Sequence, residues 1–326
     1  MKDTSSTTSI VCTLFEGDYH CGVAVLINSL YKQGFRGNIY AGYRGNLPYW
    51  TKDAIENNLL QWNGAVTLNV NGNLYIHFLP LDTNYHLTNY KPDFMLKLLN
   101  KYSCDAICYF DPDIIVNAPW SFFEEWLNCG IAVCEDVNSP LEKFHPRRVA
   151  WRNYYLNSQI ELTFKSSIYV NGGFVGLLTK YAKFLETWKT AQDLMAPAVN
   201  GLNRSKLQGE SLPLNASGPF APFSATDQDA LNVAVEASFF DFSFMRKEAM
   251  GFASGLCIVP HALGVPKPWN FKLFSYIIKG NPLRLVDKLF WEFTEEPVRI
   301  YSSSKVVKMK FIINVCTFLS RFYKKA

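Results

Sequence analysis

The sequence of 326 residues lacks features that mark several large classes of protein. It contains no apolar run of about 18 residues or more, so no transmembrane helix is predicted. The polar stretch Met1–Thr8 contains no apolar core, so we expect no signal peptide. Neither Gly-x-Gly-x-x-Gly nor a Walker lysine motif occurs, which argues against a dinucleotide site and against a P-loop.

Zinc-binding patterns of cysteine and histidine are also absent. The eight cysteines, without a signal peptide, are expected to be reduced and mostly buried thiols. Cys104 and Cys108 have the spacing of one helix face, but no second pair of Cys or His completes a zinc site.

Acidic residues are missing after Glu296, where seven of the 32 Lys and Arg residues lie. Residues 1–296 therefore carry a slight acidic excess, and the net charge of +4 comes from the C-terminal tail. A near-neutral globule with a basic tail does not have the basic face of a nucleic-acid-binding protein, so no nucleic-acid partner is expected. We predict a globular domain at 1–296 and a basic tail at 297–326.

The tail has the pattern of an amphipathic helix that lies on a membrane. Its apolar centre, Phe311–Leu319, is too short to span a bilayer. Phe311, Val315, Phe318 and Phe322 would share one helical stripe between basic flanks, which is typical of a helix on anionic lipid. The alternative is a helix packed on the core or on an oligomer partner. The membrane interpretation predicts a cytoplasmic protein, peripheral on the inner face of the cytoplasmic membrane.

The rest of the chain predicts an α/β fold. The composition, 48% hydrophobic and 15% aromatic, is enough for a substantial core. A strand at Ser9–Leu14, a loop, a helix at Gly22–Tyr31 and a second strand at Asn38–Tyr43 form a β-loop-α-β opening typical of nucleotide-binding units. We further predict a helix over Trp50–Trp62 and a hairpin turn at Asn71-Gly72.

Two carboxylates, Asp111 and Asp113, stand between a buried-looking strand, Ala106–Phe110, and the apolar run Ile114–Val116. Asp is depleted in strands, so the pair marks the open end of a sheet, and Pro112 interrupts the ladder between them. Two hard oxygen ligands aimed at one point suit Mg²⁺ or Mn²⁺, which are often shared with substrate phosphates. The alternative is a solvated turn.

Three further stretches carry polar residues at special positions. Asn171-Gly172-Gly173 interrupts a strand pattern, which indicates either a bulge or a close approach by a ligand. Thr226-Asp227-Gln228-Asp229 begins a helix, whose positive end can hold hydroxyls or negative charge. Four basic residues within 143–152 face either an anionic acceptor or solvent.

A histidine motif completes the set. His261 follows an apolar run, with Gly264 and Lys267 after it. A neutral imidazole can complete a carboxylate-held Mn²⁺ site, and a lysine can bind phosphate as a point charge.

Together these motifs resemble the retaining GT-A glycosyltransferases of glycosyltransferase family 8, the glycogenin and lipopolysaccharide galactosyltransferase type. The resemblance extends over about Ile10–Trp269, and its motifs in order are Asp-x-Asp at Asp111, Asn-x-Gly at Asn171, Asp-Gln-Asp-x-Leu-Asn at Asp227 and His-x-x-Gly-x-x-Lys-Pro-Trp at His261. It implies a single GT-A, Rossmann-like nucleotide-diphospho-sugar transferase domain with a mixed central sheet, followed by the helical tail.

The resemblance also implies a UDP-sugar donor with Mn²⁺ (or Mg²⁺) on its diphosphate. By motif position the metal ligands would be Asp111, Asp113 and His261. Gly264 and Lys267 would hold the diphosphate, and Asp111 would also touch the ribose. The other contacts to the donor would come from Thr13, Phe15, Glu16, Tyr19, Lys91 and Gly172. The reacting centre would be lined by Asn171, Asp227 and Gln228.

The implied function is retaining transfer of a hexose from a UDP-sugar to a saccharide acceptor. With the tail on a membrane, the expected acceptor is a lipid-linked intermediate of a cell-surface polysaccharide or lipopolysaccharide. Two alternatives remain open: a non-catalytic nucleotide-sugar or glycan-binding protein, and a sugar nucleotidyltransferase. The second would need a glycine-rich and basic signature near the N-terminus, which Phe15–Gly22 does not supply.

Overall fold

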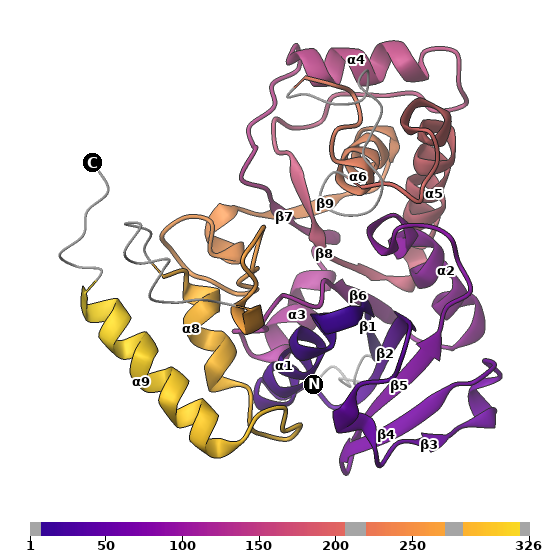
Figure 1. The fold of residues 1–326 in the computed structure, drawn as a ribbon. Coiled ribbons are helices and arrows are strands. Elements are labelled where there is room, and N and C mark those ends of the chain that lie inside the picture. The colour runs from indigo at the N-terminus through magenta and orange to yellow at the C-terminus, as the bar shows by residue number, and fades with distance from the viewer. Residues whose placement is uncertain (1–7, 206–219, 271–282, 320–326) are drawn as a thin grey trace, which may run out of the picture. The chain divides into compact units, whose positions relative to one another are not determined.

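The computed structural model describes residues 8–205, 220–270 and 283–319 (Figure 1). The chain divides into two compact units, each assembled from three segments. Unit 1 comprises Met1–Leu14, Leu81–Phe110 and Phe123–Lys247, and unit 2 comprises Phe15–Pro80, Asp111–Phe122 and Glu248–Ala326. The described residues form nine strands with parallel and antiparallel neighbours, so the predicted α/β fold with a mixed sheet is confirmed.

The strands of unit 1 follow the order β1-β6-β8-β7-β9. Their bounds are β1 Ser9–Glu16, β6 Ala106–Phe110, β7 Ile131–Glu135, β8 Val170–Leu178 and β9 Phe242–Met245. β1 is parallel to β6, β8 is antiparallel to both β6 and β7, and β7 is parallel to β9. Every residue of β6 and β7 is buried, which explains why these strands do not alternate and are apolar apart from Glu135 at the end of β7.

Helices cover the sheet of unit 1. Their bounds are α2 Lys91–Lys101, α3 Trp120–Leu127, α4 Pro146–Tyr155, α5 Lys183–Met195 and α6 Thr226–Ala237. α2 packs on β6 and α6 packs on β8, while α5 packs on both α2 and α6. α5 buries one stripe, including Phe184, Trp188, Ala191 and Met195, and this helical period turns its apolar face toward its neighbours.

Unit 2 contains strands in the order β3-β4-β5-β2, with β2 and β5 parallel and the other pairs antiparallel. Their bounds are β2 Gly37–Arg44, β3 Ile55–Glu56, β4 Val66–Asn71 and β5 Leu74–Pro80. The predicted turn at Asn71-Gly72 is confirmed, because it joins β4 to β5 with Gly72 at a φ of 56°.

The helix predicted over Trp50–Trp62 is wrong. Short 3-10 turns at Tyr49–Thr51 and Asn58–Leu60 flank β3 instead. Asn57 caps the second turn by accepting a hydrogen bond from the Leu59 amide, and Gln61 then adopts a left-handed φ of 50°. These local conformations end each turn before a helix can form.

Unit 2 also holds α1 His20–Lys32, α8 Leu285–Glu292 and α9 Ser303–Leu319. α9 packs on α8, and Lys310 forms an ion pair with Glu292 (3.1 Å). The predicted helical tail is therefore present, although Phe322 of its expected stripe lies outside the described residues. None of the helices in the described part of the chain has the length and apolar character needed to cross a membrane.

Candidate functional site

Asp111 and Asp113 lie on a tight turn that follows the end of β6 in the chain. The Ile114 amide donates to the Asp111 carbonyl oxygen (3.0 Å), which closes the turn around Pro112. The Asp113 side chain is 4% exposed and that of Asp111 is 18% exposed. The turn thus presents one deeply buried carboxylate beside a more accessible one.

His261 reaches this turn because two extended segments of unit 2 run side by side. Ile114 and His261 form an isolated antiparallel bridge. The Ala262 amide donates to the Asp113 carbonyl (3.0 Å), and the Ile115 amide donates to the Pro260 carbonyl (3.1 Å). These main-chain bonds fix the imidazole of His261 opposite the carboxylates.

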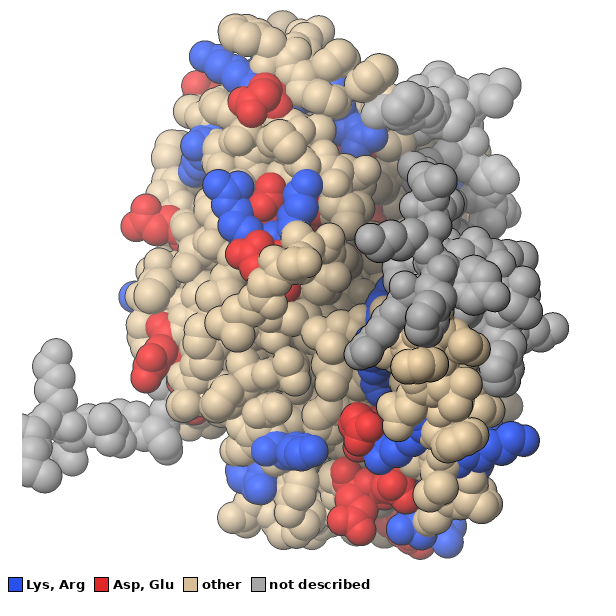
Figure 2. All heavy atoms as spheres, turned by 90° about the vertical axis from the view of Figure 1, so that its left-hand side faces the viewer, with Lys and Arg blue, Asp and Glu red and all other residues tan. Residues whose placement is uncertain are grey.

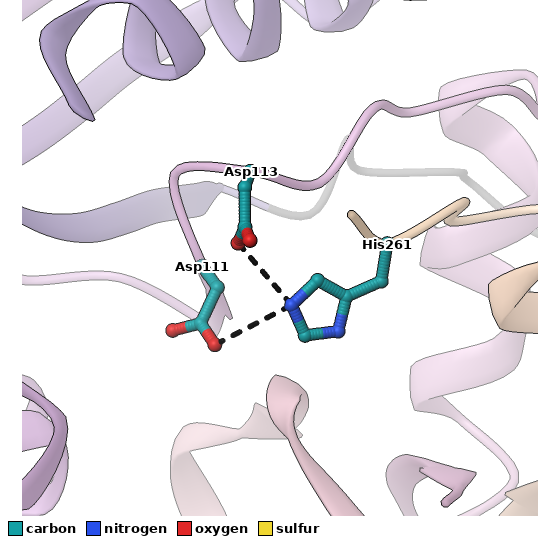
Figure 3. A group of neighbouring side chains, drawn as sticks. All are labelled: Asp111, Asp113 and His261. Atoms are coloured by element: carbon teal, nitrogen blue, oxygen red, sulfur yellow. Dashed lines mark ion pairs between the residues drawn. The ribbon is translucent and has the colours of Figure 1, made fainter. Parts of the chain in front are cut away.

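The three side chains converge on one point (Figure 3). The Nε2 atom of His261 lies 3.2 Å from Asp113 Oδ1 and 3.9 Å from Asp111 Oδ2, and one candidate ligand atom from each residue lies within 4.8 Å of the others. Octahedral metal bonds of about 2.1 Å place neighbouring ligand atoms about 3 Å apart, so this spacing fits a divalent cation. Two carboxylates with one imidazole suit Mn²⁺ or Mg²⁺ better than a soft metal.

Lys267 places a positive charge on the same group. Its Nζ forms an ion pair with Asp113 and donates to the Ala262 carbonyl (2.8 Å). Burial raises the pKa of Asp113, but the charges of His261 and Lys267 and their hydrogen bonds outweigh this, so its pKa lies well below the usual value. Burial lowers the pKa of Lys267, yet the Asp113 carboxylate raises it above its ordinary value. The carboxylate is therefore ionised and the lysine is cationic at neutral pH.

The loop at Phe15–Tyr19, which belongs to unit 2, carries aromatic and charged side chains. Tyr19 packs edge-on against Trp269 (5.4 Å between ring centroids), and Lys267 Nζ lies 5.5 Å from the centre of the Tyr19 ring. The predicted ligand residue Tyr19 thus contacts the residue predicted to hold the diphosphate. Phe15 is buried and its ring stacks on Tyr43 (5.8 Å), so that ring belongs to the core and cannot stack on a base.

Glu16 is held by Arg44, which sequence reasoning missed. Arg44 donates to Glu16 Oε2 from both Nε (3.1 Å) and Nη2 (2.7 Å), while Oε1 takes part in neither bond. Arg44 is the last residue of β2, and a position directly after a predicted strand is the signal that could have found it. Thr13, in unit 1, is fully buried, and its Oγ1 forms no hydrogen bond with the residues that the structure describes.

Unit 1 gathers a second group of predicted site residues. Lys91 is 1% exposed, and its Nζ donates to the Gly172 carbonyl (2.8 Å) and forms an ion pair with Asp227 Oδ2 (3.1 Å). Gln228 Oε1 accepts from the Gly172 amide (3.1 Å). A Cβ on Gly172 would lie 3.2 Å from Asp227 Oδ2 and 3.6 Å from Lys91 Nζ. Glycine is thus the residue that leaves room for this pair.

Asn171 is fixed by its neighbours. Its Nδ2 donates to Asp136 Oδ2 (2.7 Å), and its Oδ1 accepts from the Gly173 amide (2.8 Å). The side chain is buried, and both of its polar atoms are occupied. Asp136, which follows β7 directly, carries no motif in the sequence and could be found only from its position at a strand end.

Asp229 and Asn232 anchor the start of α6. Asp229 Oδ1 accepts from the Tyr169 hydroxyl (2.7 Å) and Oδ2 accepts from the Ala225 amide (2.7 Å). Asn232 Nδ2 donates to the carbonyls of Val170 (2.9 Å) and Gln228 (2.8 Å). The third motif therefore contains two residues that hold the backbone on either side of the Asp227-Gln228 pair. Burial raises the pKa of Asp229 to about 7, although Arg147 and two hydrogen bonds oppose the shift.

The basic residues of 143–152 do not form one surface. Arg147 and Arg148 are buried and form ion pairs with Asp229 (3.5 Å) and with Glu236. Both residues of the pair Arg148–Glu236 are 2% exposed. The prediction that these arginines face an anionic acceptor or solvent is wrong, because the acidic residues of α6 attract them into the interior.

No protein-family model matches the sequence, and no curated protein sequence matches it. The structure is similar to that of galactosyltransferase LgtC in complex with donor and acceptor sugar analogs, at 14% identity and a TM-score of 0.48, over 92% of this chain and 99% of LgtC. An active-site mutant of LgtC matches at 14% identity and a TM-score of 0.46, over 81% of this chain and 90% of that one.

The apo structure of a bifunctional glycosyltransferase, WbbM, matches at 15% identity and a TM-score of 0.45. The match covers 95% of this chain and 53% of WbbM, so this chain spans about half the length of that protein. The chain is thus similar in structure to proteins named as glycosyltransferases.

Proposed function

We propose that the protein is a retaining, metal-dependent glycosyltransferase that moves a hexose from a UDP-sugar to a saccharide acceptor. The observation that carries this proposal is the meeting of Asp111, Asp113 and His261 in unit 2, with Lys267 on Asp113. An acidic pair, an imidazole and a partly buried cation together suit a divalent ion and the diphosphate that it binds.

In this proposal Asp111, Asp113 and His261 hold Mn²⁺ or Mg²⁺. When bound, the ion supplies electrostatic stabilisation of the negative charge that develops on the leaving diphosphate. Lys267, whose cationic Nζ lies on Asp113, would bind a phosphate oxygen as a point charge. Gly264, at a φ of 71°, allows the main chain of the loop a left-handed turn beside the phosphates.

We propose that the polar group in unit 1 binds the donor sugar and lines the reacting centre. The bond between the anomeric carbon and the phosphate oxygen breaks with its electron pair going to that oxygen. The acceptor hydroxyl oxygen forms the new bond to the anomeric carbon, and its proton passes to the departing phosphate oxygen. Asp227 or the amide oxygen of Gln228 would stabilise the positive charge on the sugar, and Lys91 fixes the Asp227 carboxylate (3.1 Å). Asn171 acts by holding the backbone at Gly173 (2.8 Å).

The nucleotide base would bind at the loop Phe15–Tyr19 of unit 2. Glu16, oriented by Arg44, offers a carboxylate oxygen to an N–H of the base. Tyr19 offers a ring that is already supported by Trp269.

The tail supports a membrane-bound acceptor. α9 buries Val306, Ile313 and Cys316 on one side. The opposite side exposes Val307 (66%), Phe311 (68%) and Phe318 (57%), which recur at helical spacing. A helix that is apolar on two opposite faces has one face for the core and one for another apolar phase.

The charges near this stripe favour an anionic bilayer as that phase. Lys305 and Lys308 are exposed on the helix, and the sequence continues with Arg321, Lys324 and Lys325. Figure 2 shows Lys and Arg of the described residues in separate small groups, most of them near Asp and Glu. The attraction to anionic lipid would thus come from the tail, and we propose peripheral attachment there with a lipid-linked saccharide as acceptor.

Calorimetry with nucleotides tests the proposal. UDP, UDP-glucose, UDP-galactose, their N-acetyl forms and GDP-mannose would each be titrated with Mn²⁺ and with EDTA. We expect binding of UDP and UDP-sugars that depends on Mn²⁺, and turnover with one of the sugars. Binding of glycans alone, without any metal-dependent nucleotide binding, would instead support a glycan-binding protein.

A further inference from the structure

The loop between His261 and Lys267 is held by a residue from outside the motif. Arg284, the residue that precedes α8, donates from Nη1 to the Leu263 carbonyl (2.7 Å) and from Nη2 to the Pro266 carbonyl (2.8 Å). These two carbonyls flank Gly264-Val265. One guanidinium therefore grips the loop on both sides of its left-handed glycine.

Asp287 fixes the orientation of that guanidinium. Its Oδ2 accepts from Arg284 Nε (2.9 Å) and from the Arg284 amide (3.2 Å), and its Oδ1 accepts from Arg284 Nη2 (2.8 Å). The Asp287 side chain is 1% exposed, whereas that of Arg284 is 25% exposed. A two-pronged bond to a buried carboxylate leaves the planar guanidinium little freedom, which a lysine at this position could not reproduce.

The rest of α8 supports the same segment. Phe290 packs on Trp269, with 5.7 Å between ring centroids. Lys267 itself donates to the Ala262 carbonyl (2.8 Å). The loop therefore has a preset shape, in which the Lys267 ammonium and the Gly264 turn are placed before any ligand arrives.

We propose that Arg284, oriented by Asp287, is a positioning residue for diphosphate binding. The inference rests on the proposed function, since it assigns the loop 262–267 to the diphosphate. Arg284 acts through the backbone of that loop. It holds the loop in its bound shape beforehand, so that less conformational entropy is lost when a diphosphate binds. Binding of the divalent ion by Asp111, Asp113 and His261 should not depend on it.

The test compares Arg284→Ala, Arg284→Lys and Asp287→Asn with the full-length wild-type protein. UDP with Mn²⁺ and Mn²⁺ alone would each be titrated by calorimetry. We expect Arg284→Ala to weaken UDP binding about 10- to 100-fold and to leave Mn²⁺ binding unchanged. Arg284→Lys should recover part of the loss, because an ammonium reaches only one carbonyl well. Lys310→Ala is the matched control. It breaks the partly exposed ion pair between α9 and Glu292 at the end of α8, and it should bind UDP like the wild type.

Hydrogen exchange of the amides at 262–270 provides a readout without nucleotide. Faster exchange there in Arg284→Ala, with α1 and β5 unchanged, is expected. If Arg284→Ala binds UDP as the wild type does, or if its loop exchanges at the wild-type rate, the positioning role is wrong. If the wild type binds no nucleotide but the loop amides still exchange faster in Arg284→Ala, the proposed function is wrong. The conclusion that Arg284 holds the loop is then still supported.

Discussion

The first turn of α1 is packed directly against the turn that carries the carboxylates of Asp111 and Asp113. A Cβ added to Gly22 would lie 2.0 Å from the carbonyl oxygen of Pro112 and 3.0 Å from the ring of Trp269. Gly22 is therefore the residue that lets a helix, the Asp-Pro-Asp turn and the histidine motif meet in unit 2. Its lack of a side chain is a requirement of packing and not of backbone conformation.

Gly22→Ala should therefore destabilise the protein, although alanine is the better helix former by up to about 1 kcal/mol. Backbone atoms cannot move aside as a side chain can, so Pro112 and its flanking carboxylates must shift. We expect a lower melting temperature and Mn²⁺-dependent UDP binding weakened by about tenfold or more. Gly176→Ala is the control, because its Cβ would meet the side chain of Leu127 in unit 1 (2.8 Å), and it should lose stability without losing UDP affinity. Wild-type UDP affinity in Gly22→Ala would contradict this account.

Asp113→Asn should abolish metal-dependent turnover and leave the fold intact. The amide keeps the shape of the side chain but loses the charge that His261 and Lys267 surround. We expect turnover to fall by about two orders of magnitude or more, and the free energy of unfolding to fall by up to about 3 kcal/mol. Activity at several Mn²⁺ concentrations and urea unfolding measure the two effects. Asp53→Asn, an exposed acidic residue of unit 2, should change neither; unchanged turnover in Asp113→Asn would remove the metal assignment.

Asp229 should make the stability of the protein depend on pH. Its pKa is raised from 3.8 to about 7 in the folded state, chiefly by burial. The folded state then binds a proton more tightly than the unfolded state does, so this contribution is complete below about pH 4 and is lost as the pH rises through about 7. The contribution is at most about 4 kcal/mol. Urea unfolding between pH 4 and 8 should show a decrease in the wild type that Asp229→Asn lacks, and parallel profiles would mean that Asp229 is ionised throughout.

Arg44→Ala should weaken binding of the base with little effect on stability. The pair with Glu16 is partly exposed, at 28% and 38%, so its loss should cost less than about 1 kcal/mol of unfolding free energy. Without Arg44, the Glu16 carboxylate has no fixed orientation toward a base, and UDP affinity should fall by about tenfold. Inorganic pyrophosphate with Mn²⁺ is the control ligand, since it has no base and should bind both proteins equally. An equal loss for pyrophosphate and UDP would move the role of Arg44 from the base to the phosphates.

The sequence alone predicts those site residues that form a recognisable motif. Asp111, Asp113 and His261 can be found because two carboxylates after a strand and a histidine with glycine and lysine have few other uses together. Their meeting in unit 2 depends on main-chain bonds between segments far apart in sequence, such as the bridge from Ile114 to His261. The pattern predicts that such residues belong together, whereas the backbone pairing decides how.

Other contributors leave no pattern of their own. Arg44 and Arg284 are single arginines whose partners are fixed only by the tertiary fold, and Gly22 looks like an ordinary glycine at a helix start. Arg148 shows the opposite error, since a basic cluster in the sequence is an interior ion pair with Glu236. The segment Trp50–Trp62 has an apolar content that suits a helix, but a side-chain cap at Asn57 and a left-handed Gln61 give turns instead. Local hydrogen bonds outweigh average propensity there.

The exposed stripe on α9 makes the membrane proposal testable without removing the helix. Truncation at Ser304 would delete the buried Val306, Ile313 and Cys316 and so expose apolar surface, which complicates the result. Phe311 and Phe318 lie on the opposite side, at 68% and 57% exposure, so replacing both with serine should leave the melting temperature within a few degrees.

The double variant Phe311→Ser/Phe318→Ser should lose most of its binding to vesicles that contain anionic lipid. Burying two phenylalanine rings is worth about 3 kcal/mol or more, so partitioning should fall about 100-fold. Wild-type binding should weaken as salt rises, because the lysines beside the stripe act through charge. The replacement of the exposed Leu59 by serine, far from α9 in sequence, is the matched control. If the double variant instead changes from dimer to monomer while vesicle binding persists, the stripe is an interface between two copies of the chain, and the membrane is bound elsewhere.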